Sequence, residues 1–174
     1  MQINFEIFKK YIPIIIEGKF IISTPWQILF LKNPVLMRRK YRGKTYIYIN
    51  NNILYKISTL SLQKEIEMQM LARKCVKKFN IKVRIPEIKW WGTYKNFTIM
   101  AMQVAKGKKI INKPHLYKRI VEIENKLNKY NIFHNDWHKG NILHDEILDE
   151  LWLIDFGEAA STPNKFTNLT NFLV

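Results

Sequence analysis

Runs of apolar and β-branched residues alternate with turn residues along most of the chain, and this pattern predicts short β-strands. Glu17-Gly18 separates two such runs. Asn50 to Asn52 separates another pair, and asparagine tolerates the left-handed backbone of a tight turn. We therefore expect a hairpin at each place. The predicted strands are residues 12–16, 19–23, 26–31, 45–50, 53–57, 88–92, 97–104 and 151–154.

Two segments carry apolar residues three and four positions apart, which is the spacing of one face of an α-helix. The first lies within residues 61–80. The second, near 113–131, has Asn112 as a candidate N-cap and Pro114 in its first turn, where proline is tolerated. Each helix would bury its apolar stripe in a core. The stripe of the second helix is Leu116, Ile120, Ile123, Leu127 and Tyr130.

Composition places the 174-residue chain among globular proteins, with 47% hydrophobic and 25% charged residues. Cys75 is the one cysteine, which excludes an intrachain disulfide framework and a multi-cysteine zinc site. With 29 Lys+Arg against 14 Asp+Glu, the chain carries a formal charge of +15 and should attract polyanions. The abundance of Lys, Ile and Asn also fits an AT-rich genome, so part of this charge need not serve a function.

No apolar run approaches the roughly 18 residues that a membrane-spanning helix needs. The N-terminus carries Glu6 and no long apolar stretch followed by small residues, so it does not resemble a signal peptide. We expect a soluble intracellular protein, located in the host-cell cytoplasm if its source is a virus or a secreted effector.

Three polar residues among apolar strands carry the candidate chemistry. Asp136 and Asn141 lie in the loop after the second helix, and Asp155 directly follows the apolar strand 151–154. Carboxylate and amide oxygens suit Mg²⁺, which keeps waters and phosphate oxygens as its other ligands. One carboxylate beside two metal ligands is what phosphoryl transfer requires, because the reaction needs positioning, charge neutralisation and an acceptor for the nucleophile's proton.

The spacing of these residues resembles the protein kinase-like superfamily. The chain reads His134-x-Asp136-x-x-x-x-Asn141 and, after a strand, Asp155-Phe156-Gly157. The resemblance implies that Asp136 orients and deprotonates the acceptor hydroxyl, and that Asn141 and Asp155 hold Mg²⁺. It also implies packing roles for His134, between the catalytic loop and the Asp-Phe-Gly segment, and for Phe156, between the two lobes.

The resemblance extends upstream to the phosphate contacts of ATP. Lys56 ends a predicted strand, as does the lysine of the Val-Ala-Ile-Lys pattern, and would contact the α- and β-phosphates. Its partner would be Glu67 or Glu65 on the next helix. We favour Glu67, because the run from Glu67 to Arg73, followed by Ile85-Pro86, resembles the small kinase of the KEOPS tRNA-modification complex. The alternative for either glutamate is a solvated charge near a lysine of the same helix.

Residues 99–104 resemble the strand and hinge that hold the adenine of ATP. Met102 would lie behind the adenine, and the backbone of Gln103 and Val104 would meet its edge. The glycine-rich phosphate loop of the superfamily is nearly missing. Gly43 is the one glycine in that region, and the cations around it would substitute in part for backbone N–H groups.

His138 stands where protein serine/threonine kinases usually carry lysine. The run Asp136-Trp137-His138-Lys139-Gly140-Asn141 is similar to the catalytic loop of aminoglycoside and choline kinases. Two roles for His138 are open, a core histidine and a phosphate donor. His115 and His144 belong to no such pattern, and we expect both to be solvated.

The resemblance implies one kinase-like domain over residues 1–174, with an α+β, minimal bilobal fold. The N-lobe, residues 37–103, would be an antiparallel sheet with one helix, and the C-lobe, residues 104–174, would be reduced and helical. Residues 1–36 would be an N-terminal extension of unknown role. The sequence stops soon after Asp-Phe-Gly, so we expect a partner protein to supply the missing substrate platform.

We therefore predict an ATP- and Mg²⁺-dependent phosphotransferase, an atypical protein serine/threonine kinase with a protein substrate. The missing platform favours a macromolecular acceptor. Two alternatives are a small-molecule kinase of the aminoglycoside or choline type and a nucleotide-binding pseudokinase. The charge of +15 also predicts non-specific binding of polyanions such as nucleic acid.

Overall fold

The computed structural model describes residues 13–16, 19–23, 28–30, 35–38, 44–50, 52–94, 97–110 and 113–164. The chain divides into two compact units. The first comprises Met1–Leu62 and Ile88–Val104, and the second comprises Gln63–Glu87 and Ala105–Val174. The second unit thus takes its first segment from between two strands of the first unit.

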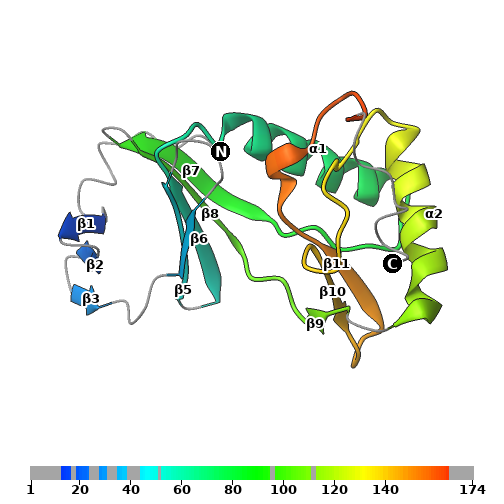
Figure 1. Ribbon diagram of the computed structural model, residues 1–174, viewed down its shortest axis with the longest axis horizontal. Helices are drawn as coiled ribbons and strands as arrows, with labels where there is room; N and C mark the ends of the chain where they lie inside the picture. Colours follow the sequence, from blue (N-terminus) through cyan, green and yellow to red (C-terminus); the bar gives the residue numbers. More distant parts are fainter. Residues whose placement is uncertain are drawn as a thin grey trace. The chain divides into compact units, whose positions relative to one another are not determined.

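A five-stranded antiparallel sheet belongs to the first unit and has the strand order β4-β5-β6-β8-β7 (Figure 1). Its strands are β4 (Val35–Arg38), β5 (Lys44–Asn50), β6 (Ile53–Ser58), β7 (Ile88–Tyr94) and β8 (Phe97–Gln103). Asn50 pairs with Ile53, and Asn52 adopts a φ of 61° in the tight turn between β5 and β6. The hairpin predicted there is confirmed.

A three-stranded antiparallel sheet in the order β1-β2-β3 also belongs to the first unit. Its strands are β1 (Pro13–Ile16), β2 (Lys19–Ser23) and β3 (Ile28–Phe30). Pro13 pairs with Ile22, and Ile16 pairs with Lys19. This register confirms the hairpin predicted around Glu17-Gly18.

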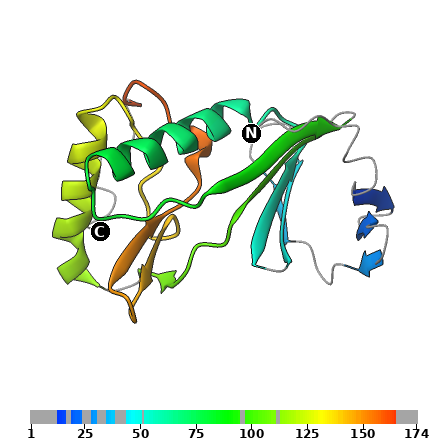
Figure 2. The same cartoon turned by 180° about the vertical axis from the view of Figure 1, so that it is seen from behind.

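The second unit combines two α-helices with a three-stranded antiparallel sheet in the order β11-β10-β9 (Figures 1 and 2). Ile120, Ile123 and Leu127 of the second helix lie in its buried core, as their spacing predicted. The elements are α1 (Gln63–Lys78), β9 (Lys108–Lys109), η2 (Pro114–Leu116), α2 (Tyr117–Asn128), β10 (Ile142–Asp145), β11 (Glu150–Leu153) and η3 (Phe156–Glu158), where η denotes a 3-10 helix.

The helix predicted near 113–131 differs from the structure at both ends. It begins as the 3-10 helix η2, and its α-helical part covers only Tyr117–Asn128. Pro114 has no N–H group, and its fixed φ suits the first turn of a helix. Asn131 adopts a φ of 56°, a left-handed conformation that stops the helix. The predicted cap, Asn112, lies outside the described residues.

Helix α1 belongs to the second unit, whereas the sequence placed it in an N-lobe of residues 37–103. The helix packs against η3 and contacts α2. The Gln69 side-chain amide donates to the Pro86 carbonyl (2.9 Å), and the Arg73 guanidinium donates to the Ile85 carbonyl (2.7 Å). These bonds join the run ending at Arg73 to the Ile85-Pro86 segment.

The α+β class is confirmed by the antiparallel sheets and the few helices of the described segments. Within those segments, no helix combines the length and the apolar character needed to cross a membrane.

Candidate active site

The loop between α2 and β10 brings together the polar residues singled out in the sequence, all within the second unit. At its start, the backbone groups of Phe133 and Ala160 pair with each other (2.9 Å each way). At its end, the Asn141 N–H donates to the His138 carbonyl (2.9 Å), and the Asn141 carbonyl accepts from the Ile154 N–H (3.0 Å). Backbone hydrogen bonds therefore fix the loop to residues on both sides of the Asp-Phe-Gly segment.

His134 joins the loop to the end of β11. Its ring is 1% exposed and packs edge-on against Phe156, with a centroid separation of 4.9 Å. Nε2 lies 2.9 Å from the Ile154 carbonyl oxygen, which can only accept, so Nε2 carries the proton. Burial lowers the pKa of His134 and favours the neutral ring. The packing of His134 against the Asp-Phe-Gly segment is the arrangement that the resemblance implied.

Asn141 orients Asp136. Its Nδ2 donates to both the carbonyl (3.0 Å) and the Oδ2 (2.8 Å) of Asp136. Because both partners are acceptors, the amide NH₂ must face Asp136. Asn141 Oδ1 has no hydrogen-bond partner within the part of the chain that the structure describes. The Asp136 side chain is 38% exposed, so this carboxylate is both oriented and accessible.

His138 lies on the surface, with its side chain 53% exposed, so the core role considered for it is wrong. The Gly140 N–H donates to Nδ1 (2.9 Å), which places the proton of the neutral ring on Nε2. That nitrogen lies 3.6 Å from Asp136 Oδ2. A Cβ atom at position 140 would lie 2.7 Å from the His138 ring, so the close contact between this ring and the backbone of residue 140 requires glycine. The role of His138 as a phosphate donor stays a prediction.

Asp155 follows β11 in a left-handed conformation, with φ 59° and ψ 76°. Aspartate tolerates this region better than most residues. The turn directs the chain into η3 and buries Phe156 completely in the core of the second unit. Asp155 itself stays half-buried, at the junction between a core strand and the Asp-Phe-Gly turn.

These residues fit Mg²⁺ as a ligand set. Asn141 Oδ1 and the Asp155 carboxylate are hard oxygens, and Mg²⁺ is typically bound by one or two such groups together with waters and phosphates. No group of three or more His, Cys, Asp or Glu residues capable of holding a metal occurs among the described residues. Waters and nucleotide phosphates would supply the other ligands of a magnesium ion held by these two residues.

Asn135 is a structural residue that sequence reasoning missed. It adopts a φ of 59°. Its Nδ2 donates to the carbonyls of Glu158 (3.3 Å) and Thr162 (3.2 Å), and its Oδ1 accepts from the Asn164 N–H (2.9 Å). The side chain thus ties the loop between α2 and β10 to the segment after η3. Asparagine inside the His134–Asp136 motif was the available clue, because asparagine is favoured where φ is positive.

His144 was expected to be solvated, and this expectation is wrong. The residue is 7% exposed, with Nε2 2.9 Å from Asp149 Oδ1 and Nδ1 3.4 Å from Lys113 Nζ. The β10–β11 hairpin returns Asp149 to the strand that carries His144, which the sequence alone does not reveal. His115 is exposed, as predicted.

The predicted phosphate-binding residues are described within each unit. In the first unit, Lys56 lies on β6, opposite Met100 of β8, and is 3% exposed. In the second unit, Glu65 and Glu67 differ sharply in burial on α1. Glu65 is 3% exposed, whereas Glu67 is exposed and accepts a hydrogen bond from the Gln63 amide (2.7 Å). The sequence favoured Glu67 as the partner of Lys56, and this choice stays a prediction; of the two glutamates, Glu65 is the buried one.

The predicted adenine-binding segment ends β8. Met102 is 8% exposed, and Gln103 pairs with Ile53 of β6. The Val104 N–H donates to the Asn52 carbonyl (3.4 Å), so an adenine would have to compete for this donor. Gly43, the predicted phosphate-loop glycine, lies outside the described residues.

The sequence matches the ABC1 atypical kinase-like domain over residues 51–174. This match spans well over half of the chain, and the protein therefore belongs to the ABC1 atypical kinase-like family. The predicted membership of the protein kinase-like superfamily is confirmed.

Among solved structures, the chain is similar to the Cydia pomonella granulovirus kinase PK-1, with 17% identity and a TM-score of 0.49. The match covers 76% of this chain and 56% of the viral kinase chain, so it spans little more than half of that protein. A comparison with curated proteins finds no match.

Proposed function

We propose that this kinase-like domain is an ATP- and Mg²⁺-dependent phosphotransferase whose acceptor is a serine or threonine hydroxyl of a protein. One observation carries the proposal: the Asn141 amide donates to both the backbone and the carboxylate of Asp136. This arrangement presents an accessible carboxylate and a buried amide whose oxygen is available to a metal.

Asp136 would accept the proton of the acceptor hydroxyl as that oxygen bonds to the γ-phosphorus of ATP. The bond from the γ-phosphorus to the β–γ bridging oxygen breaks, and ADP is the leaving group. Asn141 and Asp155 would hold Mg²⁺, which neutralises phosphate charge when bound. His134 would maintain the position of the loop through its bond to Ile154.

Lys56 would contact the α- and β-phosphates, and we assign Glu65 as its acidic partner. A buried carboxylate is costly unless it is paired or hydrogen-bonded. Glu65 is buried, whereas Glu67 is exposed and bonded to Gln63. The adenine would lie against Met102, with the backbone of residues 103 and 104 at its edge and Gly43 near the phosphates.

The choice of a protein acceptor rests on the resemblance of the run from Glu67 to Arg73, with Ile85-Pro86, to the KEOPS kinase. In this chain, hydrogen bonds from Gln69 and Arg73 to the carbonyls of residues 86 and 85 join the two parts of that motif. A partner protein that supplies a substrate platform is part of the same proposal.

Transfer of labelled γ-phosphate from ATP tests this function. The chain is incubated with Mg²⁺ and, in parallel, with casein, kanamycin or choline, and labelled protein is hydrolysed to identify its phosphoamino acids. We expect label on serine or threonine that requires Mg²⁺ and disappears in Asp136→Asn. Glu146→Gln is the matched control, because Glu146 is an exposed acid on the β10–β11 turn.

The other outcomes separate the alternatives. Label on kanamycin or choline alone would identify a small-molecule kinase. Absence of label, together with a higher melting temperature in the presence of ATP, would indicate a nucleotide-binding pseudokinase. If ATP and Mg²⁺ neither bind nor react, the nucleotide site itself is wrongly assigned.

A further inference from the structure

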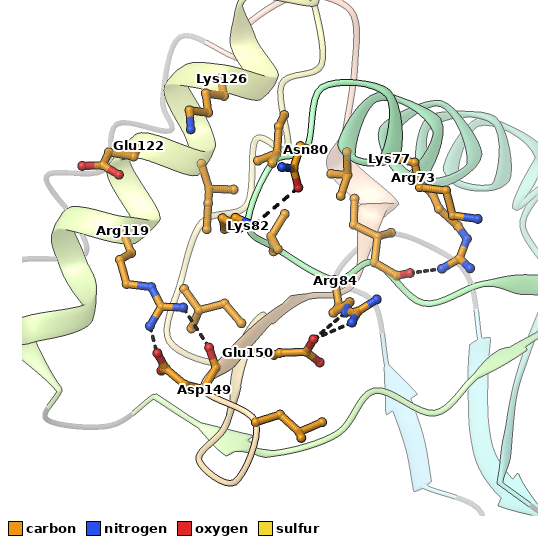
Figure 3. A pocket seen from close by; sticks show the side chains of 17 residues that line it. Arg73, Lys77, Asn80, Lys82, Arg84, Arg119, Glu122, Lys126, Asp149 and Glu150 are labelled. Carbon is orange, nitrogen blue, oxygen red and sulfur yellow. Dashed lines mark hydrogen bonds and ion pairs between the residues drawn. The ribbon is translucent and has the colours of Figure 1, made fainter.

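The second unit contains a groove of about 660 Å³ that the proposed phosphate transfer does not use (Figure 3). Its walls are the end of α1, the segment that follows to Ile85, α2 and the β10–β11 turn. The Asp145 carboxylate fixes that turn by accepting from the N–H groups of Ile147 (3.1 Å) and Leu148 (3.3 Å). Segments far apart in the sequence thus form one concave surface.

The lining of the groove is rich in cations. Three carboxylates, Glu122, Asp149 and Glu150, stand among them. The cations outnumber the carboxylates two to one, so the groove has a positive surplus. The cationic side chains are Arg73, Lys77, Lys82, Arg84, Arg119 and Lys126.

Each of the three arginines forms an ion pair with a carboxylate. Arg84 donates to Glu150 Oε1 from two nitrogens (2.9 and 2.5 Å). Arg119 donates to the carboxylate (2.8 Å) and the carbonyl (3.0 Å) of Asp149. Arg73 lies 3.6 Å from Glu87. These ion pairs fix the walls and leave the positive surplus to the lysines.

Among the described residues, none of the three lysines of the groove has an acidic partner. Lys82 reaches only the neutral amide of Asn80, at 3.5 Å. Across the described ranges, neither Lys77 nor Lys126 forms an ion pair within 4.0 Å. The remaining acid, Glu122, likewise forms no ion pair with a described residue. Within the described part of the chain, three ammonium groups and one carboxylate of the lining are therefore left without an ion pair.

The floor of the groove is aliphatic. Ile81, Ile123 and Leu151 are buried beneath it, Val76 is half-buried, and Leu148 is 57% exposed at its edge. The lining contains no aromatic side chain on which a base could stack. The nearby Phe79 and Tyr130 stack on each other, with centroids 3.9 Å apart.

We propose that this groove binds an acidic segment of a partner protein that carries aliphatic side chains between its carboxylates. Such a segment places apolar groups over the floor and carboxylates beside Lys77, Lys82 and Lys126. A nucleic-acid strand fits less well, because its bases would find no aromatic side chain in the lining on which to stack.

Fluorescence anisotropy with defined probes tests the proposal on the full chain. The main probe is a labelled twelve-residue peptide of alternating glutamate and leucine, and the comparison probes are a glutamate–serine peptide of equal charge and a single-stranded oligouridine. The variant Lys77→Gln/Lys82→Gln/Lys126→Gln should weaken binding of the glutamate–leucine peptide by about tenfold or more, since each lost ionic contact contributes modestly. Leu148→Ser should weaken it less, and should not affect the glutamate–serine peptide.

The matched control is Lys64→Gln/Lys109→Gln/Lys118→Gln, which removes three exposed lysines outside the groove and the same net charge. We expect this control to keep nearly the parent affinity, and melting temperatures verify that both triple variants fold. Equal losses of peptide affinity in the two variants would show that binding depends only on the overall charge, and would overturn the proposal. Absence of peptide binding by the parent chain would also overturn it, as would groove-dependent binding of oligouridine alone.

Discussion

Two polar regions of the second unit differ in what their side chains bond to. In the catalytic loop, Asn141 holds Asp136, Gly140 holds the His138 ring, and His134 bonds to the backbone of β11's end. In the groove beside α2, the lysines have no acidic partners among the described residues. The polar side chains of the loop are hydrogen-bonded to one another and to the backbone, whereas the lysines of the groove are exposed to solvent.

This difference predicts different energetics for the two regions. Polar groups already oriented in the folded protein need little reorganisation during a reaction, and removal of one member disturbs the others. Solvated lysines lose side-chain freedom when they bind, and each contributes little. Substitutions in the loop should therefore have large, non-additive effects, whereas those in the groove should have small effects that add and that weaken with salt.

The largest effect is expected at Asp136. Asp136→Asn keeps the bond to Asn141 but cannot accept a proton, so the initial rate of phosphate transfer should fall by about 10²–10⁴-fold while Mg-ATP affinity stays close to that of the parent. Asp155→Asn should instead weaken Mg-ATP binding, measured by calorimetry. If both variants transfer phosphate at the parent rate, the active site is wrongly assigned and the comparison fails.

The next largest effect distinguishes two glutamates of one helix. Glu65→Gln removes a buried charge, and if Glu65 is the acidic partner proposed for Lys56 it should reduce transfer by more than about tenfold. Glu67→Gln removes an exposed carboxylate bonded to Gln63 and should stay within about threefold of the parent, because exposed pairs contribute little. Equal small losses, measured as kcat/KM for ATP, would argue against Glu65 as the partner of Lys56.

A smaller effect concerns stability. Asn135→Gly removes three hydrogen bonds but tolerates the positive φ, so the free energy of unfolding should fall by about 1–3 kcal/mol. The triple variant of Lys77, Lys82 and Lys126 should stay within about 0.5 kcal/mol of the parent, because exposed side chains rarely affect folding. Urea unfolding followed by circular dichroism measures both. A similar loss of unfolding free energy in Asn135→Gly and in the triple lysine variant would contradict the expected difference between the hydrogen-bonded loop and the solvent-exposed groove.

The spacing of apolar and polar residues along the chain predicted much of the fold. The strand runs, the buried positions of α2 and the motif from His134 to Asp155 depend on spacing along the chain, and the structure shows each of them. Tyr130, the last residue of the predicted stripe, lies after the end of α2 and is 41% exposed, so its place in the core was predicted wrongly. Element ends were less predictable. The 3-10 start of the second helix and its early stop depend on Pro114 and on the backbone at Asn131, which compete with the helical pattern.

Features created by tertiary packing were not predictable. Glu65 and Glu67 are two residues apart on one helix, and only the packing of α1 decides which is buried. His144 and Asp149 meet because a hairpin folds back, and sequence patterns do not identify that pair. The groove is assembled from distant segments, so its lysines look like ordinary surface charges in the sequence.

The smallest predicted effect is a pH dependence with opposite signs in the loop and in helix α2. Burial lowers the pKa of His134 in the loop below its ordinary value of 6.5. Below that pH the unfolded chain binds a proton that the folded chain does not, so His134 makes stability fall as the pH drops. Burial raises the pKa of Glu124, on the helix α2 that forms one wall of the groove, from 4.5 to about 7. Between pH 4.5 and about 7, the folded chain keeps the proton of Glu124 that the unfolded chain has lost. The free energy of unfolding therefore falls as the pH rises through this range, and it levels off above it.

Glu124→Gln isolates the second contribution. The variant has no carboxyl group to ionise, so its melting temperature should exceed that of the parent by a margin that is small near pH 5 and grows up to about pH 8. Glu122→Gln, on the same helix but exposed, is the control and should show no such growth. Melting curves of the three proteins across this range measure the effect. A constant difference between Glu124→Gln and the parent would mean that the carboxyl group does not titrate between 4.5 and 7, and that packing alone causes the change.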